Sequence, residues 1–370
     1  MKDLRIIISG GGTGGHIFPA IAIANALKSK YPDVKILFVG AEGRMEMTKV
    51  PAAGYEIVGL NIAGLNRKQV FKNFSVASKL LRSFGKAKRI IRDFKPDVVV
   101  GVGGYASGPT LKMASSLHIP TLLQEQNSYA GITNKYLAKK ASKICVAYEG
   151  MEKFFPKDKI VLTGNPVRQD LDSPALNKEE SYKHFNLDPS KKTILVIGGS
   201  LGSRTINMSI ISQVDLLKNK NIQILWQCGG HYISEMAVQL NGKEDIKDQV
   251  FLHDFINRMD YAYNAADLVV SRAGASSISE LSLLGKPSIL IPSPNVAEDH
   301  QSRNAEALVR KDAAIMMKDN DAIVNLMQTA LEIVEDEGKL KSLSENILKL
   351  AQHDSADRIV DEIIKLVDKE

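Results

Sequence analysis

The amino-acid sequence predicts an α/β fold with two Rossmann-like, doubly wound domains that face a cleft. Short apolar runs alternate with helical segments along the whole chain, and a strand, a glycine-rich turn and a helix open each half. Several runs are apolar throughout, as expected for parallel strands covered by helices on both faces. The expected strands span residues 4–8, 34–39, 98–102, 121–123, 144–147, 160–162, 194–197, 222–226, 250–252, 268–270 and 288–291.

The composition is that of a globular protein large enough for two domains. The chain has 370 residues, of which 44% are hydrophobic and 24% are charged. Its net charge of +6 permits an anionic partner, either nucleic acid or a membrane. No apolar run approaches the roughly 18 residues of a membrane span, and the first run is too short for a signal peptide. Cys145 and Cys228 lie in apolar runs, which predicts reduced thiols in a cytoplasmic protein.

The first half opens with the segment LRIIISGGGTGGHIFPA. The strand expected over 4–8 is followed by five glycines interrupted by Thr13, and then by a helix expected over 17–26. Bare backbone lets an anion approach closely, and the N–H groups that begin a helix point toward it. The arrangement therefore favours a phosphate-binding turn.

The turn alone leaves more than one interpretation open. Gly10, Gly12 and Gly15 fit the dinucleotide-binding pattern, with Glu42 as the acid for the ribose. A nucleoside-triphosphate loop is excluded because His16 stands where that loop needs a lysine. A tight turn without a ligand is the remaining alternative. The choice between these interpretations depends on motifs elsewhere in the chain.

The second half repeats this opening in the segment TILVIGGSLGSRTIN. Before it lies a stretch with three prolines and many charges, GNPVRQDLDSPALNKEESYKHFNLDPSKK, which we interpret as linker and surface with the joint near Gly164. A single dehydrogenase domain does not need the second glycine turn. The duplication therefore favours a two-domain transferase.

The segment SRAGASSISELSLLGKP, residues 271–287, is the most specific one. Gly274 gives a turn after a strand, Ser276 or Ser277 is expected to cap the next helix, and Glu280 shares a helix face with both serines. A carboxylate there can accept the two hydroxyls of a ribose while the helix N-terminus attracts a diphosphate. The alternative is a capping box followed by an ordinary amphipathic helix.

Three further polar segments follow predicted strands. They are GVGGYASGP at 101–109, QEQNSYAG at 124–131 and EDHQSRNA at 298–305. The first offers a second anion site in the first domain, and the second concentrates amides that can bond to sugar hydroxyls. Open α/β sheets bind ligands at the carboxyl ends of their strands, where all three segments are expected.

Seven of these motifs, in this order, resemble the signature of the MurG family: GGGTGGH, GGYASGP, QEQN, GNPVR, GGSLGS, SRAGASSISE and HQSRNA. The resemblance implies a glycosyltransferase-B fold that moves N-acetylglucosamine from UDP-N-acetylglucosamine to the 4-hydroxyl of the N-acetylmuramyl group of lipid I, with inversion. The products are lipid II of peptidoglycan synthesis and UDP. The expected domains are an acceptor- and membrane-binding domain at 1–163, a UDP-sugar domain at 164–345, and a helix at 346–370 that packs back on the first domain.

The resemblance also implies site residues. Glu280 would bind the ribose hydroxyls, and the backbone of Ile256 would bracket the uracil. The acceptor diphosphate would lie at Gly103, Gly104, Tyr105 and Ser107. The full set implied for the donor is Thr13, Gly14, Gly15, Asn127, Arg168, Ser200, Ile256, Ala275, Ser276, Ser277, Ile278, Ser279, Glu280 and Gln301.

The expected chemistry needs a base but no metal and no cofactor. We favour His16 as the base, because a helix start disfavours the imidazolium form, and we hold Glu125 as the second candidate. Helix N-termini and Arg168 are expected to stabilise the departing diphosphate. The Asp-x-Asp at 319–321 is interpreted as a helix cap and not as a metal site. Gln124 stands where the family often has histidine, so it is excluded as a base.

The segment 65–95 is strongly basic, with ten lysines and arginines against the single acid Asp93, and apolar residues lie among them. This composition predicts a helix that binds an anionic membrane surface. The lipid acceptor that the resemblance implies places the expected enzyme at the cytoplasmic face of the bacterial plasma membrane, as a peripheral protein. No aromatic platform or nucleic-acid module accompanies the charge, so no nucleic acid is expected as a partner. Other cell-wall synthesis proteins are further candidate partners.

Three rival functions remain at this stage. A UDP-N-acetylglucosamine 2-epimerase shares the architecture and the nucleotide sugar, but its chemistry needs several acids around the sugar. Another glycolipid glycosyltransferase of the same fold would differ only in its acceptor. A nucleotide-sugar sensor would leave the basic segment unexplained.

Overall fold

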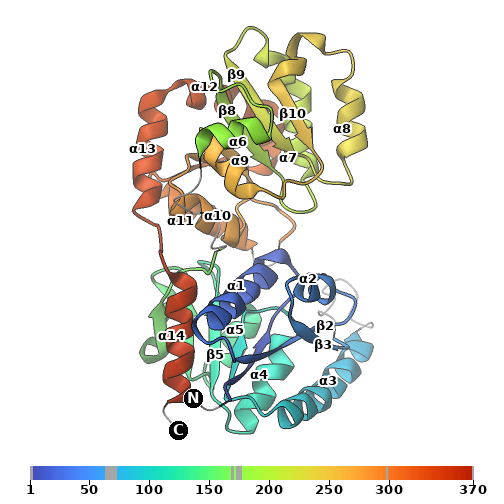
Figure 1. Ribbon diagram of the computed structural model, residues 1–370, viewed down its shortest axis with the longest axis vertical. Coiled ribbons are helices and arrows are strands. Elements are labelled where there is room, and N and C mark those ends of the chain that lie inside the picture. Colours follow the sequence, from blue (N-terminus) through green and yellow to red (C-terminus); the bar gives the residue numbers. More distant parts are fainter. Residues whose placement is uncertain (1–2, 63–72, 168–170, 172–176, 297–298, 369–370) are drawn as a thin grey trace. The chain divides into compact units, whose positions relative to one another are not determined.

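The computed structural model describes residues 3–62, 73–167, 171, 177–296 and 299–368, and the side chains of 73–78 lie outside the description. The chain divides into two compact units (Figure 1). Unit 1 comprises Met1–Arg168 and Gln352–Glu370, and unit 2 comprises Gln169–Ala351. Unit 1 therefore includes both chain ends.

Unit 1 is built on a parallel sheet in the order β3-β2-β1-β4-β5-β6-β7. The central strands β4 and β5 are buried throughout. β4 is accordingly apolar on both faces, whereas β5 ends in the buried polar residues Gln124 and Glu125. The strands are β1 Arg5–Ser9, β2 Lys35–Ala41, β3 Glu56–Leu60, β4 Val98–Gly101, β5 Thr121–Glu125, β6 Lys143–Val146 and β7 Ile160–Leu162.

Helices cover both faces of this sheet. One face packs against α1 (Gly14–Lys30), α2 (Glu46–Ala52) and α14 (Ser355–Val367). The other packs against α3 (Asn73–Phe94), α4 (Ser107–Ser116) and α5 (Ile132–Leu137). The last helix, α14, comes from the far end of the chain and lies along α1. Unit 1 thus depends on residues that follow all of unit 2.

Unit 2 repeats the plan with the order β10-β9-β8-β11-β12-β13, again parallel. One face carries mainly α7, α8 and α12, and the other mainly α6, α9, α10 and α11. The strands are β8 Lys192–Ile197, β9 Ile222–Gln227, β10 Val250–His253, β11 Leu268–Ser271, β12 Ser288–Leu290 and β13 Ile315–Met316. The helices are α6 Lys178–His184, α7 Arg204–Gln213, α8 Ile233–Leu240, α9 Met259–Ala265, α10 Ala275–Leu283, α11 His300–Val309, α12 Asp319–Glu335 and α13 Glu337–Leu348.

The predicted α/β class with two doubly wound domains is confirmed, and each expected strand is present within a few residues. The expectation for the segment between the two sheets is wrong. The stretch interpreted as linker and surface contains α6, and Tyr182, Phe185 and Leu187 are at most 8% exposed in the core of unit 2. Burial of these apolar side chains places the segment against the core, while the charged side chains around them point outward.

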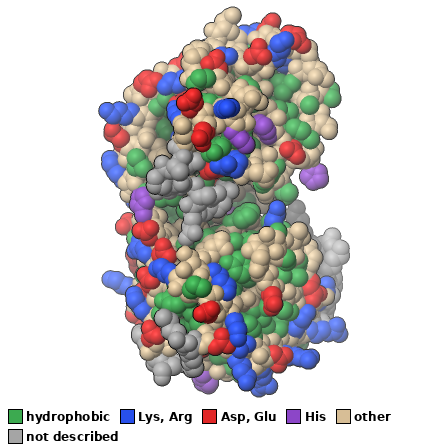
Figure 2. Space-filling view, in the orientation of Figure 1, with side chains coloured by type: hydrophobic (Ala, Val, Ile, Leu, Met, Phe, Trp, Pro, Cys, Tyr) green, Lys and Arg blue, Asp and Glu red, His purple; other side chains and the backbone are tan. Residues whose placement is uncertain are grey.

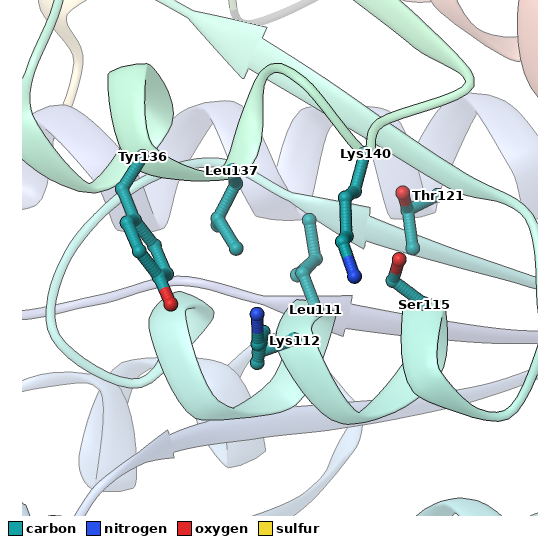
Figure 3. A pocket seen from close by; sticks show the side chains of 7 residues that line it. All are labelled: Leu111, Lys112, Ser115, Thr121, Tyr136, Leu137 and Lys140. Carbon is teal, nitrogen blue, oxygen red and sulfur yellow. The ribbon is translucent and has the colours of Figure 1, made fainter.

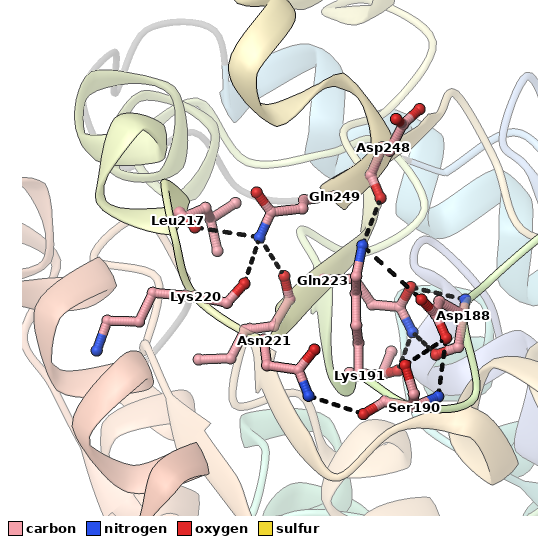
Figure 4. A network of polar contacts seen from close by, with 11 residues as sticks. Asp188, Ser190, Lys191, Leu217, Lys220, Asn221, Gln223, Asp248 and Gln249 are labelled. Atoms are coloured by element: carbon pink, nitrogen blue, oxygen red, sulfur yellow. Dashed lines mark hydrogen bonds and ion pairs between the residues drawn. The ribbon is translucent and has the colours of Figure 1, made fainter.

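A polar network fixes the amino ends of β8 and β9 in unit 2 (Figure 4). The amide of Gln249 donates to the carbonyls of Leu217, Lys220 and Ile222 at 2.8–3.1 Å. Gln223 exchanges hydrogen bonds with the backbone of Asp188. These contacts stabilise the end of the sheet opposite to the glycine turns.

Candidate active site

Each sheet has two central strands, and a glycine turn follows each of these strands, so the two units together have four glycine turns. In unit 1 they come after β1 and β4, which are neighbours at the point where the strand order reverses. In unit 2 they come after β8 and β11, which meet at the equivalent point. The crevice at such a reversal is where open α/β sheets bind ligands. Each unit therefore has one ligand-binding edge defined by its topology.

The helices after these turns are suited to anions. α1, α4, α7 and α10 have no acidic residue in the first turn, whereas α6, α12 and α13 do. The N–H groups of their first turns have no partner within the helix and carry partial positive charge. An anionic group at these turns would therefore meet only attractive charge from the helix ends.

In unit 1 the first glycine turn is held by Glu46, which sequence reasoning missed. Its carboxylate is 1% exposed and accepts hydrogen bonds from the N–H groups of Gly12 at 2.9 Å and Ala41 at 3.0 Å. A Cβ on Gly11 would stand 2.1 Å from this carboxylate. The glycine is thus required by a buried acid from α2. No local motif marks Glu46, because the contact spans 34 residues.

His16 lies in the first turn of α1, beside both glycine turns of unit 1. Its Nδ1 is 3.2 Å from the carbonyl oxygen of Gly11 and 3.2 Å from Oγ1 of Thr13. A Cβ on Gly103 would stand 2.9 Å from Nε2. The imidazole therefore lies between the turn that carries it and the turn after β4.

The turn after β4 approaches the first turn backbone to backbone. Gly104 has a φ of +86°, and a Cβ there would stand 2.3 Å from the carbonyl oxygen of Gly11. Tyr105 is 50% exposed. Ser107 is fully buried, and its hydroxyl contacts the carbonyls of Ser9 and Gly103. Ser107 thus ties the two turns together, while Tyr105 faces solvent.

The QEQN segment forms a buried polar cluster at the end of β5. Glu125 is 2% exposed and accepts hydrogen bonds from the backbone and side chain of Asn127, from the N–H of Gly131 and from the amide of Asn134. Burial raises the pKa of the Glu125 carboxyl, and these hydrogen bonds oppose the shift. Gln124 donates to Asn165 at 2.9 Å. The cluster fixes Asn127, which is partly exposed.

In unit 2 the turn after β8 lies against the turn after β9. A Cβ on Gly202, whose φ is +80°, would stand 2.0 Å from the carbonyl oxygen of Cys228. Gln227, also missed by sequence reasoning, donates to the carbonyl of Gly199 and accepts from the N–H of Ile256 at 2.9 Å. One buried amide thus connects the glycine turn with the Ile256 segment. Ser200 is exposed in the same turn.

The N-terminus of α10 departs from the expected cap. The N-cap is Gly274, with extended backbone and no side-chain cap, so neither Ser276 nor Ser277 caps the helix. Both serines already have helical backbone, which a capping residue does not. The hydroxyl of Ser276 is buried and has no hydrogen-bond partner among the described residues. Glu280 accepts a hydrogen bond from the hydroxyl of Tyr263 at 2.9 Å.

The Asp-x-Asp at the start of α12 is not a cap either, since the N-cap is Lys318. Asp319 forms an ion pair with Arg272 and accepts a hydrogen bond from Thr205 at 2.7 Å. Arg272 also donates to the carbonyls of Ile291 and Pro292. The pair is half-buried and links the ends of β11 and β12 with the starts of α7 and α12. The spacing of residues in the sequence did not predict this ion pair.

The remaining predicted residues are placed as follows. Gln301, in the first turn of α11, accepts a hydrogen bond from the N–H of Ser293 at 2.8 Å. Ala275 and Ile278 are buried, whereas Ser279 is partly exposed. Thr13 is exposed, and Gly14 and Gly15 are partly exposed. Arg168 lies outside the described residues, as does segment 65–72.

In the described part of the chain, no group of three or more His, Cys, Asp or Glu side chains could hold a metal ion. No helix in that part has the length and apolar character to cross a membrane.

Comparisons with known proteins agree with this geometry. Residues 6–146 match the glycosyltransferase family 28 N-terminal domain, and residues 193–359 match its C-terminal domain. The chain is 63% identical over its full length to the UDP-N-acetylglucosamine--N-acetylmuramyl-(pentapeptide) pyrophosphoryl-undecaprenol N-acetylglucosamine transferase of Parabacteroides distasonis, all of which is covered. It is 55% identical to the protein of the same name from Flavobacterium psychrophilum, again with full coverage of both chains.

A solved structure of Acinetobacter baumannii MurG is 27% identical, with a TM-score of 0.77 over 98% of this chain and 99% of that one. Fold, site and comparisons together define a two-domain glycosyltransferase of family 28. Within that class, the chain belongs to the MurG family.

Proposed function

We infer that this chain transfers N-acetylglucosamine from UDP-N-acetylglucosamine to lipid I, giving lipid II and UDP in peptidoglycan synthesis. Relatives named for this transfer match the chain from end to end at 63% and 55% identity. The structural observation that carries the proposal is the set of four glycine turns at the two strand-order reversals, each followed by a helix without first-turn acids. Such turns suit a reaction between two diphosphate-containing substrates.

Unit 2 is proposed to bind the donor. The N-termini of α7 and α10 attract the diphosphate, and the buried hydroxyl of Ser276 is available to one of its oxygens. Glu280 accepts the ribose hydroxyls, with Tyr263 holding the carboxylate in place. The Ile256 segment, fixed by Gln227, takes the uracil. Ser200, Gln301 and Arg168 complete the proposed donor site.

Unit 1 is proposed to bind the acceptor diphosphate at Gly103, Gly104 and Tyr105 and to supply the base. The carbonyl of Gly11 can only accept, so a neutral His16 ring that bonds to it carries its proton on Nδ1. Nε2 is then the basic nitrogen. It takes the proton of the acceptor 4-hydroxyl as the oxygen attacks C1 of the sugar, and the bond from C1 to the UDP oxygen breaks with inversion.

Glu125 has a different proposed role. Its two carboxylate oxygens accept four hydrogen bonds and are almost inaccessible, so this group is poorly placed to receive a substrate proton. It holds Asn127 instead, whose amide is proposed to contact N-acetylglucosamine. We therefore assign the base to His16 and a positioning role to Glu125.

The basic segment is proposed to bind an anionic membrane at the cytoplasmic face. The described part of α3 exposes Lys79, Arg82 and Leu81, the last 71% exposed, while Ile91 packs into the core. Figure 2 shows Lys and Arg side chains along the edge of unit 1 where Figure 1 places α3. Replacing Lys79, Arg82 and Lys88 by Glu should weaken binding to anionic vesicles. Lys86 is spared, since it pairs with Glu42.

Incubation with UDP-N-acetylglucosamine and a short-chain lipid I analogue tests the proposed function. We expect the corresponding lipid II analogue and UDP in equal amounts. Release of free N-acetylmannosamine would indicate epimerisation instead. A solved UDP-N-acetylglucosamine 2-epimerase resembles the chain at 15% identity, which shows the fold alone. Binding of the nucleotide sugar without turnover would support a sensor.

A further inference from the structure

A short chain of hydrogen bonds connects Glu46, the buried acid of α2, with the imidazole of His16. The carboxylate accepts from the N–H of Gly12 at 2.9 Å, and Nδ1 of His16 lies 3.2 Å from the carbonyl oxygen of Gly11. That carbonyl and that N–H belong to the same peptide group, because the carbonyl carbon of Gly11 is bonded to the nitrogen of Gly12. One peptide group therefore separates the carboxylate from the imidazole.

The surroundings of Glu46 suit its ionised form. Its second oxygen accepts from the N–H of Ala41 at 3.0 Å, and the residue is 1% exposed. Two N–H donors satisfy a carboxylate, whereas a protonated acid would direct its own O–H toward a donor. Gly40 leaves space for the side chain, since a Cβ there would stand 2.6 Å from Cγ of Glu46. No described lysine or arginine forms an ion pair with Glu46, so its negative charge acts directly on the turn.

The carboxylate affects the imidazole in two ways. A peptide whose N–H donates to a carboxylate is polarised, and its carbonyl oxygen becomes a stronger acceptor. The Gly11 carbonyl then favours the tautomer that carries its proton on Nδ1 and leaves Nε2 basic. The negative charge also stabilises the imidazolium that forms when Nε2 takes a proton. The N-terminus of α1 acts in the opposite direction, because its partial positive charge disfavours the imidazolium.

We propose that Glu46 is a positioning residue for the base, which orients His16 and offsets the charge of the helix N-terminus through the Gly11–Gly12 peptide group. The arrangement resembles the pairing of an acid with the imidazole in a catalytic triad, with a peptide group inserted between them. No proton moves along this chain. Glu46 stays ionised, Nδ1 keeps its proton, and Nε2 takes the proton of the acceptor hydroxyl. The proposal rests on the assignment of His16 as the base of the proposed transfer.

The other charged groups on the elements around His16 act elsewhere. Lys30, at the far end of α1, pairs with Asp357 and Asp361 of α14. Lys112 of α4 borders a hollow between α4 and α5 (Figure 3). Solvent screens the titratable side chains that are exposed on α2 and on the neighbouring turns, namely Glu42, Arg44, Lys49 and Tyr105. Among the described carboxylates, Glu46 is therefore the one that contacts the turn of the base.

The test compares Glu46→Gln with Glu42→Gln, which removes one negative charge from the same segment. Glu42 is exposed and pairs with Lys86 at 2.9 Å. In Glu46→Gln we expect the acid limb of kcat/KM to move to lower pH by about 0.5 pH unit or more, and kcat on the plateau to fall about tenfold. Glu42→Gln should change neither. Affinity for UDP should stay within about twofold in both variants, because the proposed donor site lies in unit 2.

A titration of the His16 ring by NMR gives a readout that does not depend on turnover. The ring signals are assigned by comparison with His16→Ala. In the wild type, the ring nitrogen shifts should show a neutral form with its proton on Nδ1. The midpoint of the titration should move to lower pH in Glu46→Gln and less far in Glu46→Asp, which keeps the charge.

Three results would overturn the proposal. The first is a wild-type ring that carries its neutral-form proton on Nε2, a measurement that needs no variant to fold. The second is a lower kcat in Glu46→Gln with an unchanged ring titration, which would show that Glu46 only shapes the turn. The third is an equal loss from Glu46→Gln in the wild type and in the His16→Ala background, which would show that the two residues act independently. Failure of the proposed transfer is distinguishable, because the ring titration is measured without substrates.

Discussion

At the residue scale, the chemistry depends on how His16 is held. Glu46 fixes Gly12, the neighbouring Gly11 carbonyl orients Nδ1, and Gly103 lets the ring approach the second turn. A Cβ would collide with Glu46 at Gly11 and with the His16 ring at Gly103, whereas Gly12 is favoured by its φ of +89°. A histidine at this position is therefore oriented by backbone atoms and by one buried acid.

Replacement of His16 by Ala tests the proposed base. We expect kcat to fall by about 100-fold or more, since this is the usual contribution of a positioned base. Affinity for UDP should stay within about twofold, because the proposed donor site lies in unit 2. Steady-state kinetics and calorimetry measure the two effects. A kcat close to that of the wild type would reject the base role.

At the element scale, the ion pair of Arg272 and Asp319 holds the loops around α10. Asp319→Asn keeps the shape and the contact with Thr205 but removes the charge that Arg272 needs. We expect KM for UDP-N-acetylglucosamine to rise about tenfold with a smaller change in kcat. Removing one partner of a buried pair costs about 3–5 kcal/mol, and the partial exposure here puts the loss of stability below that range.

Glu335→Gln provides the matched control in the same unit. Its partner Lys220 forms an ion pair at 2.8 Å in which both side chains are well exposed. Exposed pairs contribute about 0–1 kcal/mol, so neither KM nor stability should change measurably. Equal effects of the two substitutions on KM would contradict a positioning role for Arg272.

The sequence predicts elements unequally. Central strands such as Val98–Gly101 are apolar on both faces and were predicted directly. The edge strand β3 begins at an exposed Glu56, and β13 has only two residues, so neither gives a clear pattern.

The candidate site also has parts that the sequence predicts and parts that it does not. Glycine turns are local and visible in the sequence. The side chains that hold them are not, because Glu46, Gln227 and Arg272 contact residues that lie 34, 28 and 47 positions away. The caps assigned to Ser276 and Asp319 failed for a related reason: a capping motif does not determine where the helix begins.

At the scale of the whole molecule, unit 1 is completed by α14. Ile359, Val360 and Ile363 are fully buried in its core, although unit 2 separates them from the rest of unit 1 in the sequence. Cys145 lies in the same core, and burial raises the pKa of its thiol to about 12, so it stays protonated at neutral pH. The folding of unit 1 is thus linked to the end of the chain.

Ile363→Ala tests this dependence. Loss of a fully buried isoleucine should destabilise unit 1 by about 2–5 kcal/mol, seen as faster hydrogen exchange in β1 and β4. Exchange in unit 2 should be unchanged. Asp361→Ala, which removes only an exposed ion pair between α14 and Lys30 at 3.0 Å, should alter stability by less than about 1 kcal/mol. Uniform loss of protection in both units would contradict a role limited to unit 1.

The central claim is that UDP binds at the carboxyl edge of the unit 2 sheet. A crystal structure of the protein with UDP tests it most directly. We predict the diphosphate at the N-terminus of α10, within hydrogen-bond distance of Ser276, and the ribose hydroxyls at Glu280. A nucleotide bound instead at the glycine turns after β1 and β4 would contradict the account.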